Sequence, residues 1–200
     1  METHAIPMRE RGSRLRHDAR GNPRSADREA FSQIVNSCDR QLRTLAYRLL
    51  GDAHQMDDVL QEAYLKAYRA FPSFRNDSAP STWLYRITYN VCMDHLRKHG
   101  RLESHGGSAS IDALAENGFE PRSAENLEST VHARAELADA LSALPPDHRA
   151  AVLLVDAFGH DYATAASIMR VAPGTVASRL SRARATLRTH LANGTKEGHR

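Results

Sequence analysis

The chain is poor in cysteine and aromatic residues and has no long apolar run. Its two cysteines, Cys38 and Cys92, cannot build the disulfide framework of a small secreted domain, so we expect buried free thiols and a cytoplasmic location. No apolar stretch approaches the ~18 residues that a membrane span needs, which predicts no membrane insertion. Residues 1–24 are charged and have no apolar core, so we expect a flexible tail rather than a secretory signal.

Motifs that carry enzymatic chemistry are missing as well. The sequence has no G-x-x-x-x-G-K-[ST] or G-x-G-x-x-G phosphate loop and no G-x-S-x-G nucleophile elbow. His95 and His99 are four residues apart, but even with Cys92 they fall short of a zinc site. We therefore expect a non-catalytic protein without metal or cofactor.

Charge is spread unevenly, although the net charge is only +3. Residues 101–130 hold six acidic residues against two basic ones, a net charge of −4, among many Gly, Ser and Asn. This composition predicts a flexible acidic linker over residues 100–133. So long a linker is unusual inside one compact domain, which indicates two domains. Neither half shows the alternation of apolar and polar residues that is typical of strands. We therefore predict an all-α fold with two small helical domains, residues 25–99 and 134–192, and a tail over 193–200.

The segment QMDDVLQEAYLKAYRAF has the clearest helical periodicity. Its predicted buried stripe consists of Met56, Val59, Leu60, Ala63, Ala67 and Phe71. Its opposite face carries Asp58, Gln61, Glu62, Leu65 and Arg69. The pattern alone favours an ordinary solvated face, while the alternative is a docking surface for a basic partner with Leu65 as its apolar anchor.

A turn-rich loop precedes a second helical segment, STWLYRITYNVCMDHLRKHG, which Ser81 or Thr82 can cap and Gly100 ends. Its predicted buried stripe is Leu84, Ile87 and Val91, with Trp83 at the edge. The far side carries Tyr85, Arg86, Tyr89, Asn90, Met93 and Arg97. Aromatic residues interleaved with Arg and Asn suit stacking on bases and contact with phosphate. A helix buried on two sides explains the same pattern equally well.

The second half of the chain predicts a helix-turn-helix. One short helix is indicated by the spacing of Leu137, Leu141 and Leu144, and it ends before a Pro-Pro pair. Pro146 can begin the next helix and Gly159 can end it. The short helix DYATAASIM, the turn RVAP and a basic helix follow, with Ala166 and Val176 in the packed core of the motif.

The segment VAPGTVASRLSRARATLR contains four arginines and no acidic residue. Its predicted apolar stripe is Val176, Leu180, Ala183 and Leu187, and its opposite face is Ala177, Ser178, Ser181 and Ala185. Arginines flank that small-residue face on both sides. Small residues let a helix approach a groove closely, while arginines reach phosphates or guanine edges. The pattern therefore predicts DNA binding by this helix.

The blocks DDVLQEAYLKAYRAFPSFRNDSAPSTWLYRITYNVCMDHLRK and LSALPPDHRAAVLLVDAFGHDYATAASIMRVAPGTVASRLSRARATLR resemble regions 2 and 4 of bacterial σ70-type sigma factors, in particular the extracytoplasmic-function (ECF) subfamily. The resemblance implies a factor that binds core RNA polymerase (β′ and β subunits) and directs initiation at the −35 and −10 promoter elements. It also implies melting of the −10 duplex, a stress response, control by an anti-sigma factor and a linker that threads the RNA channel of the polymerase.

The same resemblance assigns roles to residues of this chain. Core polymerase would bind Asp58, Gln61, Glu62 and Leu65. The −10 element would be read and opened by Trp83, Arg86, Tyr89, Asn90 and Arg97, since an unpaired base must be caught as the duplex opens. The −35 element would be read by Thr175, Ser178, Arg179, Arg182 and Arg184.

Four positions depart from the family pattern. Arg170 replaces a usual Gly in the helix-turn-helix turn, Thr164 replaces a frequent Glu, Ala177 replaces Lys, and Pro80 replaces a common aromatic residue. We expect these changes to alter promoter preference rather than the fold. Two other interpretations remain open, a stand-alone dimeric helix-turn-helix regulator and a nucleic-acid enzyme with a DNA-binding tail.

Overall fold

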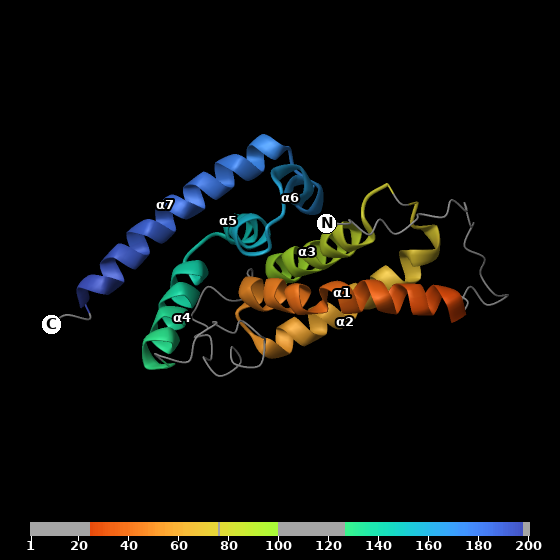
Figure 1. The fold of residues 1–200 in the computed structure, drawn as a ribbon, viewed down its shortest axis with the longest axis horizontal. Coiled ribbons are helices and arrows are strands. Elements are labelled where there is room, and N and C mark those ends of the chain that lie inside the picture. Colours follow the sequence, from red (N-terminus) through yellow and green to blue (C-terminus); the bar gives the residue numbers. More distant parts are fainter. Residues whose placement is uncertain (1–24, 76, 100–126, 198–200) are drawn as a thin grey trace, which may run out of the picture.

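The computed structural model describes residues 25–75, 77–99 and 127–197, and these residues form helices and loops without a strand (Figure 1). In the N-terminal half, three helices pack against one another. They are α1 (Ser25–Leu50), α2 (Ala53–Ala70) and α3 (Pro80–His99), with the short 3₁₀ helix η1 (Phe71–Ser73) after α2. The predicted buried stripe of α2 is confirmed, since all six of its residues lie in the core.

The start of α3 differs from the prediction. The helix begins at Pro80, and the main-chain N–H of Trp83 donates to the oxygen of Ala79 at 3.0 Å. Ala79 therefore occupies the capping position, and Ser81 and Thr82 already lie in the first turn. A proline suits the first helical position because its missing N–H would have no partner there. Gly100, the predicted stop, lies outside the described residues.

The C-terminal half consists of α4 (Leu127–Ser142), α5 (Pro146–Val152), the π-helical turn η3 (Leu153–Ala157), α6 (Tyr162–Met169) and α7 (Pro173–Glu197). Residues 127–133, predicted as linker, are helical, and α7 runs past residue 192. Leu141 and Leu144 are buried, whereas Leu137 is 40% exposed. Leu144 lies beyond the end of α4. Pro146 begins α5 as predicted.

The helix-turn-helix is formed by α6 and α7. Asp161 caps α6 by accepting a hydrogen bond from the Thr164 main-chain N–H at 2.6 Å. Ala166 and Val176 are buried, as expected for the small and apolar contacts of this motif. Arg170, at the turn, adopts a left-handed conformation with φ of 55°.

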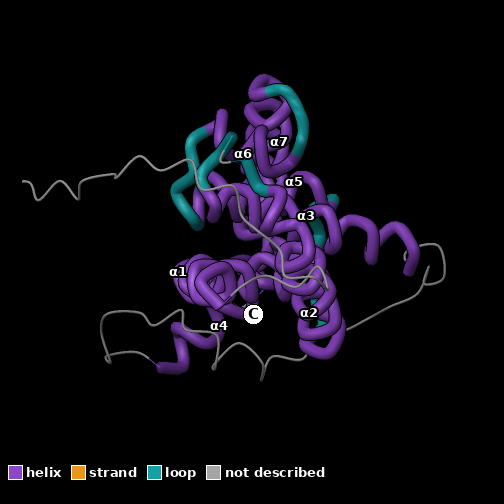
Figure 2. The backbone as a smooth tube through the Cα atoms, turned by 90° about the vertical axis from the view of Figure 1, so that its right-hand side faces the viewer, coloured by secondary structure: helices purple, strands orange, loops and turns teal. Residues whose placement is uncertain are grey.

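The two halves of the chain pack against each other. Helix α6 lies on α3, and α5 lies against the end of α1 (Figures 1 and 2). Buried residues of both halves form one continuous apolar cluster. The two halves therefore share a core in this conformation rather than standing apart as separate domains. The predicted N-terminal tail, residues 100–126 of the predicted linker and residues 198–200 lie outside the described residues, whereas residues 193–197 of the predicted C-terminal tail belong to α7.

Candidate nucleic-acid interface

The outer face of α2 is open to solvent. Asp58, Gln61, Glu62 and Leu65 are all exposed, and Leu65 keeps 49% of its surface accessible. These four residues, which we call the docking face, line one surface depression together with the side chains of Lys66 and Arg69. Lys66 donates to Glu62 at 2.6 Å, and this hydrogen bond lowers the pKa of the Glu62 carboxyl. The docking face is thus anionic with an apolar residue at its edge.

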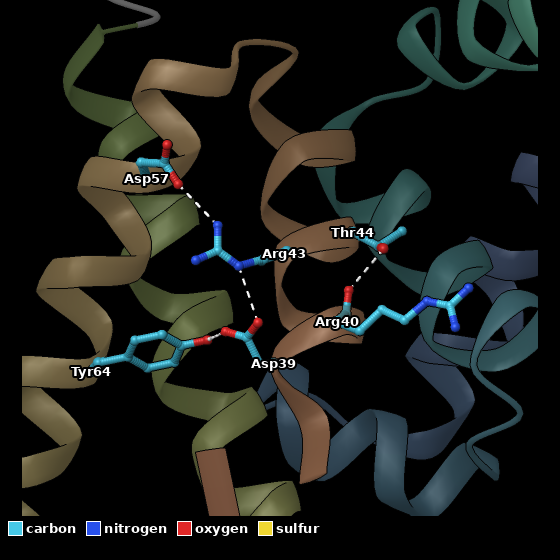
Figure 3. Close-up of polar contacts among 6 residues, drawn as sticks. All are labelled: Asp39, Arg40, Arg43, Thr44, Asp57 and Tyr64. Atoms are coloured by element: carbon cyan, nitrogen blue, oxygen red, sulfur yellow. Dashed lines mark hydrogen bonds and ion pairs between the residues drawn. The ribbon is translucent and has the colours of Figure 1, made fainter. Parts of the chain in front are cut away.

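A polar network fixes α2 to α1 behind this face (Figure 3). The Arg43 guanidinium donates to Asp39 at 3.1 Å and to Asp57 at 3.0 Å. The Tyr64 hydroxyl donates to the other oxygen of Asp39 at 2.7 Å. Burial and this hydrogen bond raise the Tyr64 pKa, so the hydroxyl stays a donor. Because Arg43 contacts both helices, the docking face has a defined orientation relative to the helical core.

The second set of predicted site residues lies along α3, and we call it the α3 face (Trp83, Arg86, Tyr89, Asn90 and Arg97). Trp83 is half-buried, and its ring lies 4.9 Å from that of Phe74. Asn90 is half-buried, and Arg97 is exposed and paired with Asp94 at 2.9 Å. The remaining two residues contact the C-terminal half.

Of the two interpretations left open for this helix, an outward face does not hold for Tyr85 and Tyr89, which are only 1% and 4% exposed. Tyr85 donates to Gln41 of α1 and contacts the rings of Phe158 and His160. Tyr89 donates to Asp147 at 2.9 Å. Helix α3 is therefore buried on two sides, against α1 and α2 on one side and against α6 on the other. The alternative explanation of the sequence pattern holds in this conformation.

The third set lies at the beginning of α7. Its apolar stripe is buried as predicted, with Leu187 half-buried at the end. Thr175 is half-buried, and Ser178 and Arg182 are exposed. The Ser178 hydroxyl donates to the Thr175 main-chain oxygen at 2.9 Å, which is a local bond that a base edge can replace. The helix thus presents hydroxyl groups and an unobstructed Arg182 guanidinium to solvent.

Two of the predicted arginines on α7 have acidic partners that the sequence did not indicate. Arg179 pairs with Asp147 at 2.8 Å, and Arg184 holds Asp156 with two hydrogen bonds of 3.0 and 2.5 Å. The paired Asp156 raises the pKa of the Arg184 guanidinium. These partners lie about thirty residues away along the chain, so no local pattern could have revealed them. Ser167 of α6, which accepts from Arg86, was missed for the same reason.

Among the residues that the structure describes, no group of His, Cys, Asp and Glu could hold a metal ion. The His95 ring instead bonds to Gln55 at 2.9 Å and stacks on the His99 ring at 4.0 Å. Cys38 and Cys92 are both buried as free thiols, and burial raises the pKa of each. Over the same described ranges, none of the helices is long and apolar enough to cross a membrane.

Comparison with family models gives two matches. Residues 34–102 match the model of sigma-70 region 2, and residues 134–187 match the model of sigma-70 region 4. The described helices that carry the docking face and the α3 face lie in the first match. Helix α6 and residues 173–187 of α7 lie in the second.

Among curated proteins, the chain is 39% identical over 163 residues to the ECF RNA polymerase sigma factor SigM of Mycobacterium tuberculosis, covering 82% of this chain and 78% of that protein. It is 37% identical over 165 residues to the ECF RNA polymerase sigma-E factor of Escherichia coli, covering 79% and 84%.

Two solved structures have a similar fold. The sigma factor RpoE of Bartonella quintana, solved with the anti-sigma factor NepR, superposes with a TM-score of 0.65 at 29% identity, covering 82% of this chain and 98% of that one. CnrH, solved with the cytosolic domain of CnrY, gives a TM-score of 0.60 at 23% identity and covers 83% and 90%, which supports the fold alone.

Proposed function

The chain belongs to the ECF subfamily of σ70-type sigma factors, and from this premise we propose how its residues divide the work of initiation. Residues 25–99 bind core RNA polymerase and open the −10 element, while residues 134–192 read the −35 element. The polymerase supplies the chemistry, so the chain itself is a non-catalytic factor. It acts in the cytoplasm, where polymerase and promoter DNA are found.

The observation that carries the proposal is the exposed docking face on α2. Asp58, Gln61, Glu62 and Leu65 are exposed to solvent, and Leu65 is 49% exposed. Burial of this leucine by a partner would be favourable. An anionic face with an apolar anchor fits a basic partner that covers Leu65. We assign this face to the β′ subunit of core polymerase. The Arg43 network holds it in place because it ties α2 to α1.

Helix α7 supports the assignment to the −35 element. Its N-terminal turns combine small residues, exposed hydroxyl groups and arginines, and a major groove admits such a helix. We assign base contacts to Thr175, Ser178, Arg179 and Arg182, with Arg184 contacting phosphate. Between α6 and α7 the chain turns through Arg170, which has a left-handed conformation.

The α3 face supports the assignment to the −10 element. Trp83 offers a half-buried ring next to Phe74, which suits stacking of an unpaired base. Asn90 and Arg97 lie further along the same helix, where they can reach base edges and phosphate. We also propose an anti-sigma partner, because the relative RpoE was solved in complex with one.

Run-off transcription tests the proposal. The purified chain is added to core polymerase on a library of genomic promoter fragments, and we expect transcripts from a subset of templates only. Core polymerase alone is the control. Absence of any chain-dependent transcript would refute the proposed function. A tight dimeric DNA complex without polymerase in a gel-shift assay would favour the stand-alone regulator instead.

A further inference from the structure

A row of aromatic rings leads away from Trp83 at the end of the molecule where α1 begins. The Trp83 ring lies 4.9 Å from that of Phe74 and 6.2 Å from that of Phe71. From Phe71 the row continues through Phe31 of α1 to Tyr68 of α2, with ring centroids 5.5 Å apart at each step. Residues of α1, α2, η1 and α3 thus meet at this end of the molecule (Figure 1).

The exposed side chain of Arg28 lies at the far end of this ring row. Its Nε donates to the Tyr68 hydroxyl oxygen at 3.1 Å. A guanidinium has five N–H donors, so this bond leaves the terminal nitrogens available to a ligand. Arg28 forms no ion pair with a described acidic residue. Its charge is therefore oriented by Tyr68 but is not neutralised.

The position of Arg28 within α1 does not favour a cation. Arg28 is the fourth residue of the helix, close to the partial positive charge of the helix N-terminus. The preceding Asp27 suits this place and is buried, with 7% of its surface exposed. One hydrogen bond to an uncharged hydroxyl contributes only modestly to stability. The arrangement therefore suits an anionic ligand better than it serves the helix.

A second exposed arginine, Arg75, follows Phe74 directly and likewise has no ion pair with a described acidic residue. The C-terminal half contacts α1 at its other end, where Arg149 donates to the main-chain oxygen of Arg48. Arg28 and the ring row therefore lie at the end of α1 that is remote from this contact (Figure 1).

A single DNA strand fits rings and arginines arranged in this way. Aromatic side chains stack with unpaired bases, while basic side chains follow the phosphates of the same strand. Arginine suits phosphate because two of its N–H groups can donate in parallel. The orientation of Arg28 leaves such a pair available.

We propose that Arg28, oriented by the Tyr68 hydroxyl, binds a backbone phosphate of the single DNA strand whose unpaired base stacks on Trp83. The inference rests on the proposed function, because it takes the stacking role of Trp83 from it. Arg28 and Phe31 precede residues 34–102, which match sigma-70 region 2, so the site extends the −10 surface beyond that match. The buried rings of Phe31 and Phe71 fix the spacing between the base site and the phosphate site.

Tryptophan fluorescence tests this site directly, because Trp83 is the only tryptophan in the chain. Unlabelled oligothymidine is titrated into the full chain across a salt series, without polymerase or promoter. We expect stacking of a thymine base to quench the Trp83 fluorescence. The degree of quenching gives the binding constant K of the strand that occupies Trp83.

Arg28→Ala should weaken this binding severalfold. The slope of log K against log salt should become shallower by about 0.7, which is the contribution of one phosphate of a single strand. Arg28→Lys keeps the charge and should retain the slope. Tyr68→Phe keeps the ring and removes the orienting hydroxyl, so it should weaken binding without changing the slope. Circular dichroism confirms that each variant retains its helices.

Arg40→Ala is the matched control, because it removes the same charge from an exposed position of the same helix. Arg40 lies about 18 Å from Arg28 along α1. We expect K and the salt slope of this variant to stay close to those of the unchanged chain.

Three results would overturn the site. They are absence of Trp83 quenching by oligothymidine, equal loss of affinity in Arg28→Ala and Arg40→Ala, and an unchanged salt slope in Arg28→Ala. Strand binding that depends on Arg28, together with no chain-dependent transcript in the run-off assay, would refute the proposed function and leave the site intact. Promoter-dependent transcripts together with equal losses in Arg28→Ala and Arg40→Ala would refute the site alone.

Discussion

The guanidinium of Arg149 in α5 donates a hydrogen bond to the main-chain oxygen of Arg48, in the last turn of α1, at 2.8 Å. The same Nη1 also reaches the oxygen of Leu49 at 3.2 Å, while Nη2 donates to the oxygens of Ser142 and Leu144. The carbonyl groups at the end of a helix lack partners within the helix and carry partial negative charge. One buried cation therefore satisfies the ends of α1 and α4 together and joins the two halves.

Replacement of Arg149 by Ala should lower the free energy of unfolding by about 2–4 kcal/mol, because it leaves several buried carbonyl groups without a donor. Arg149→Lys should be intermediate, since an ammonium group cannot span two helix ends with a planar fork. Urea unfolding followed by circular dichroism measures both. Arg188→Ala, at an exposed arginine of α7, is the control and should change stability by less than about 0.5 kcal/mol. Equal effects of Arg149→Ala and Arg188→Ala would refute the role of Arg149.

Arg170 should be a site where glycine stabilises the protein. Its φ of 55° costs an L-residue roughly 1–2 kcal/mol, a cost that glycine avoids. Part of this gain in stability is offset, because glycine also gives the unfolded chain more conformational freedom. We expect Arg170→Gly to raise the free energy of unfolding by up to about 1 kcal/mol. Gly159→Ala is the reciprocal variant, because Gly159 has φ of 74° and open space for a methyl group, so only backbone strain is added. A destabilised Arg170→Gly would show that the Arg170 side chain has a larger role than its backbone strain.

The local parts of this architecture could be predicted from the sequence. Helical periodicity identified the buried stripes of α2 and α7, and Pro146 and Gly159 marked the ends of the α5 segment. The α3 pattern was ambiguous because Tyr85 and Tyr89 are amphipathic and suit either solvent or a partly polar interface. Their burial depends on contacts with Phe158, His160 and Asp147, which lie about sixty to seventy-five residues further along the chain. Periodicity within one helix cannot reveal a contact of that kind, nor the pairing of Arg179 with Asp147.

Charge reversal on the docking face should abolish polymerase binding. Asp58→Arg places a positive charge where we expect a basic partner, while the exposed position leaves the fold unaffected. Association with core polymerase, measured by co-purification, should be lost. Glu136→Arg on α4 is the matched control, with the same change of charge at an exposed helical position, and should still co-purify. Retention of Asp58→Arg by the polymerase would refute the docking assignment.

Arg182 and Arg184 should differ in their contribution to DNA binding, although only two residues separate them. Arg182 is exposed and forms no ion pair with a described acidic residue, whereas Arg184 is held by two hydrogen bonds to Asp156. Arg182→Ala should weaken binding of a promoter duplex by about tenfold, which is the loss expected for one base contact. Arg184→Ala should cost less, because Asp156 already neutralises that charge. Fluorescence anisotropy across a salt series measures both, and a larger loss for Arg184→Ala would contradict the argument.

Acid should loosen the packing of the C-terminal half on α3 through His160. The His160 ring is half-buried and packs edge-on against the Tyr85 ring of α3 at a centroid distance of 5.0 Å. Burial lowers the His160 pKa, and the neighbouring Asp161 opposes that shift only in part. The packed conformation, with the C-terminal half on α3, therefore favours the neutral ring. Separation of the two halves restores the ordinary pKa of about 6.5. The contribution of His160 to packing is therefore complete above that pH and is lost as the pH falls through it towards the lower pKa of the packed form.

The distance between spin labels at Lys66→Cys on α2 and His190→Cys on α7, both exposed sites, measures this effect, since the native thiols are buried. Between about pH 7.5 and about pH 5.5, a population at longer distance should grow. His160→Asn should remove most of the response, because no proton is then taken up on separation. His54→Asn, at an exposed histidine of α2, should leave the response intact. Circular dichroism at both pH values distinguishes separation of the two halves from unfolding, since separation keeps every helix. An acid response of equal size in His160→Asn would assign the titration to another group and refute the role of His160.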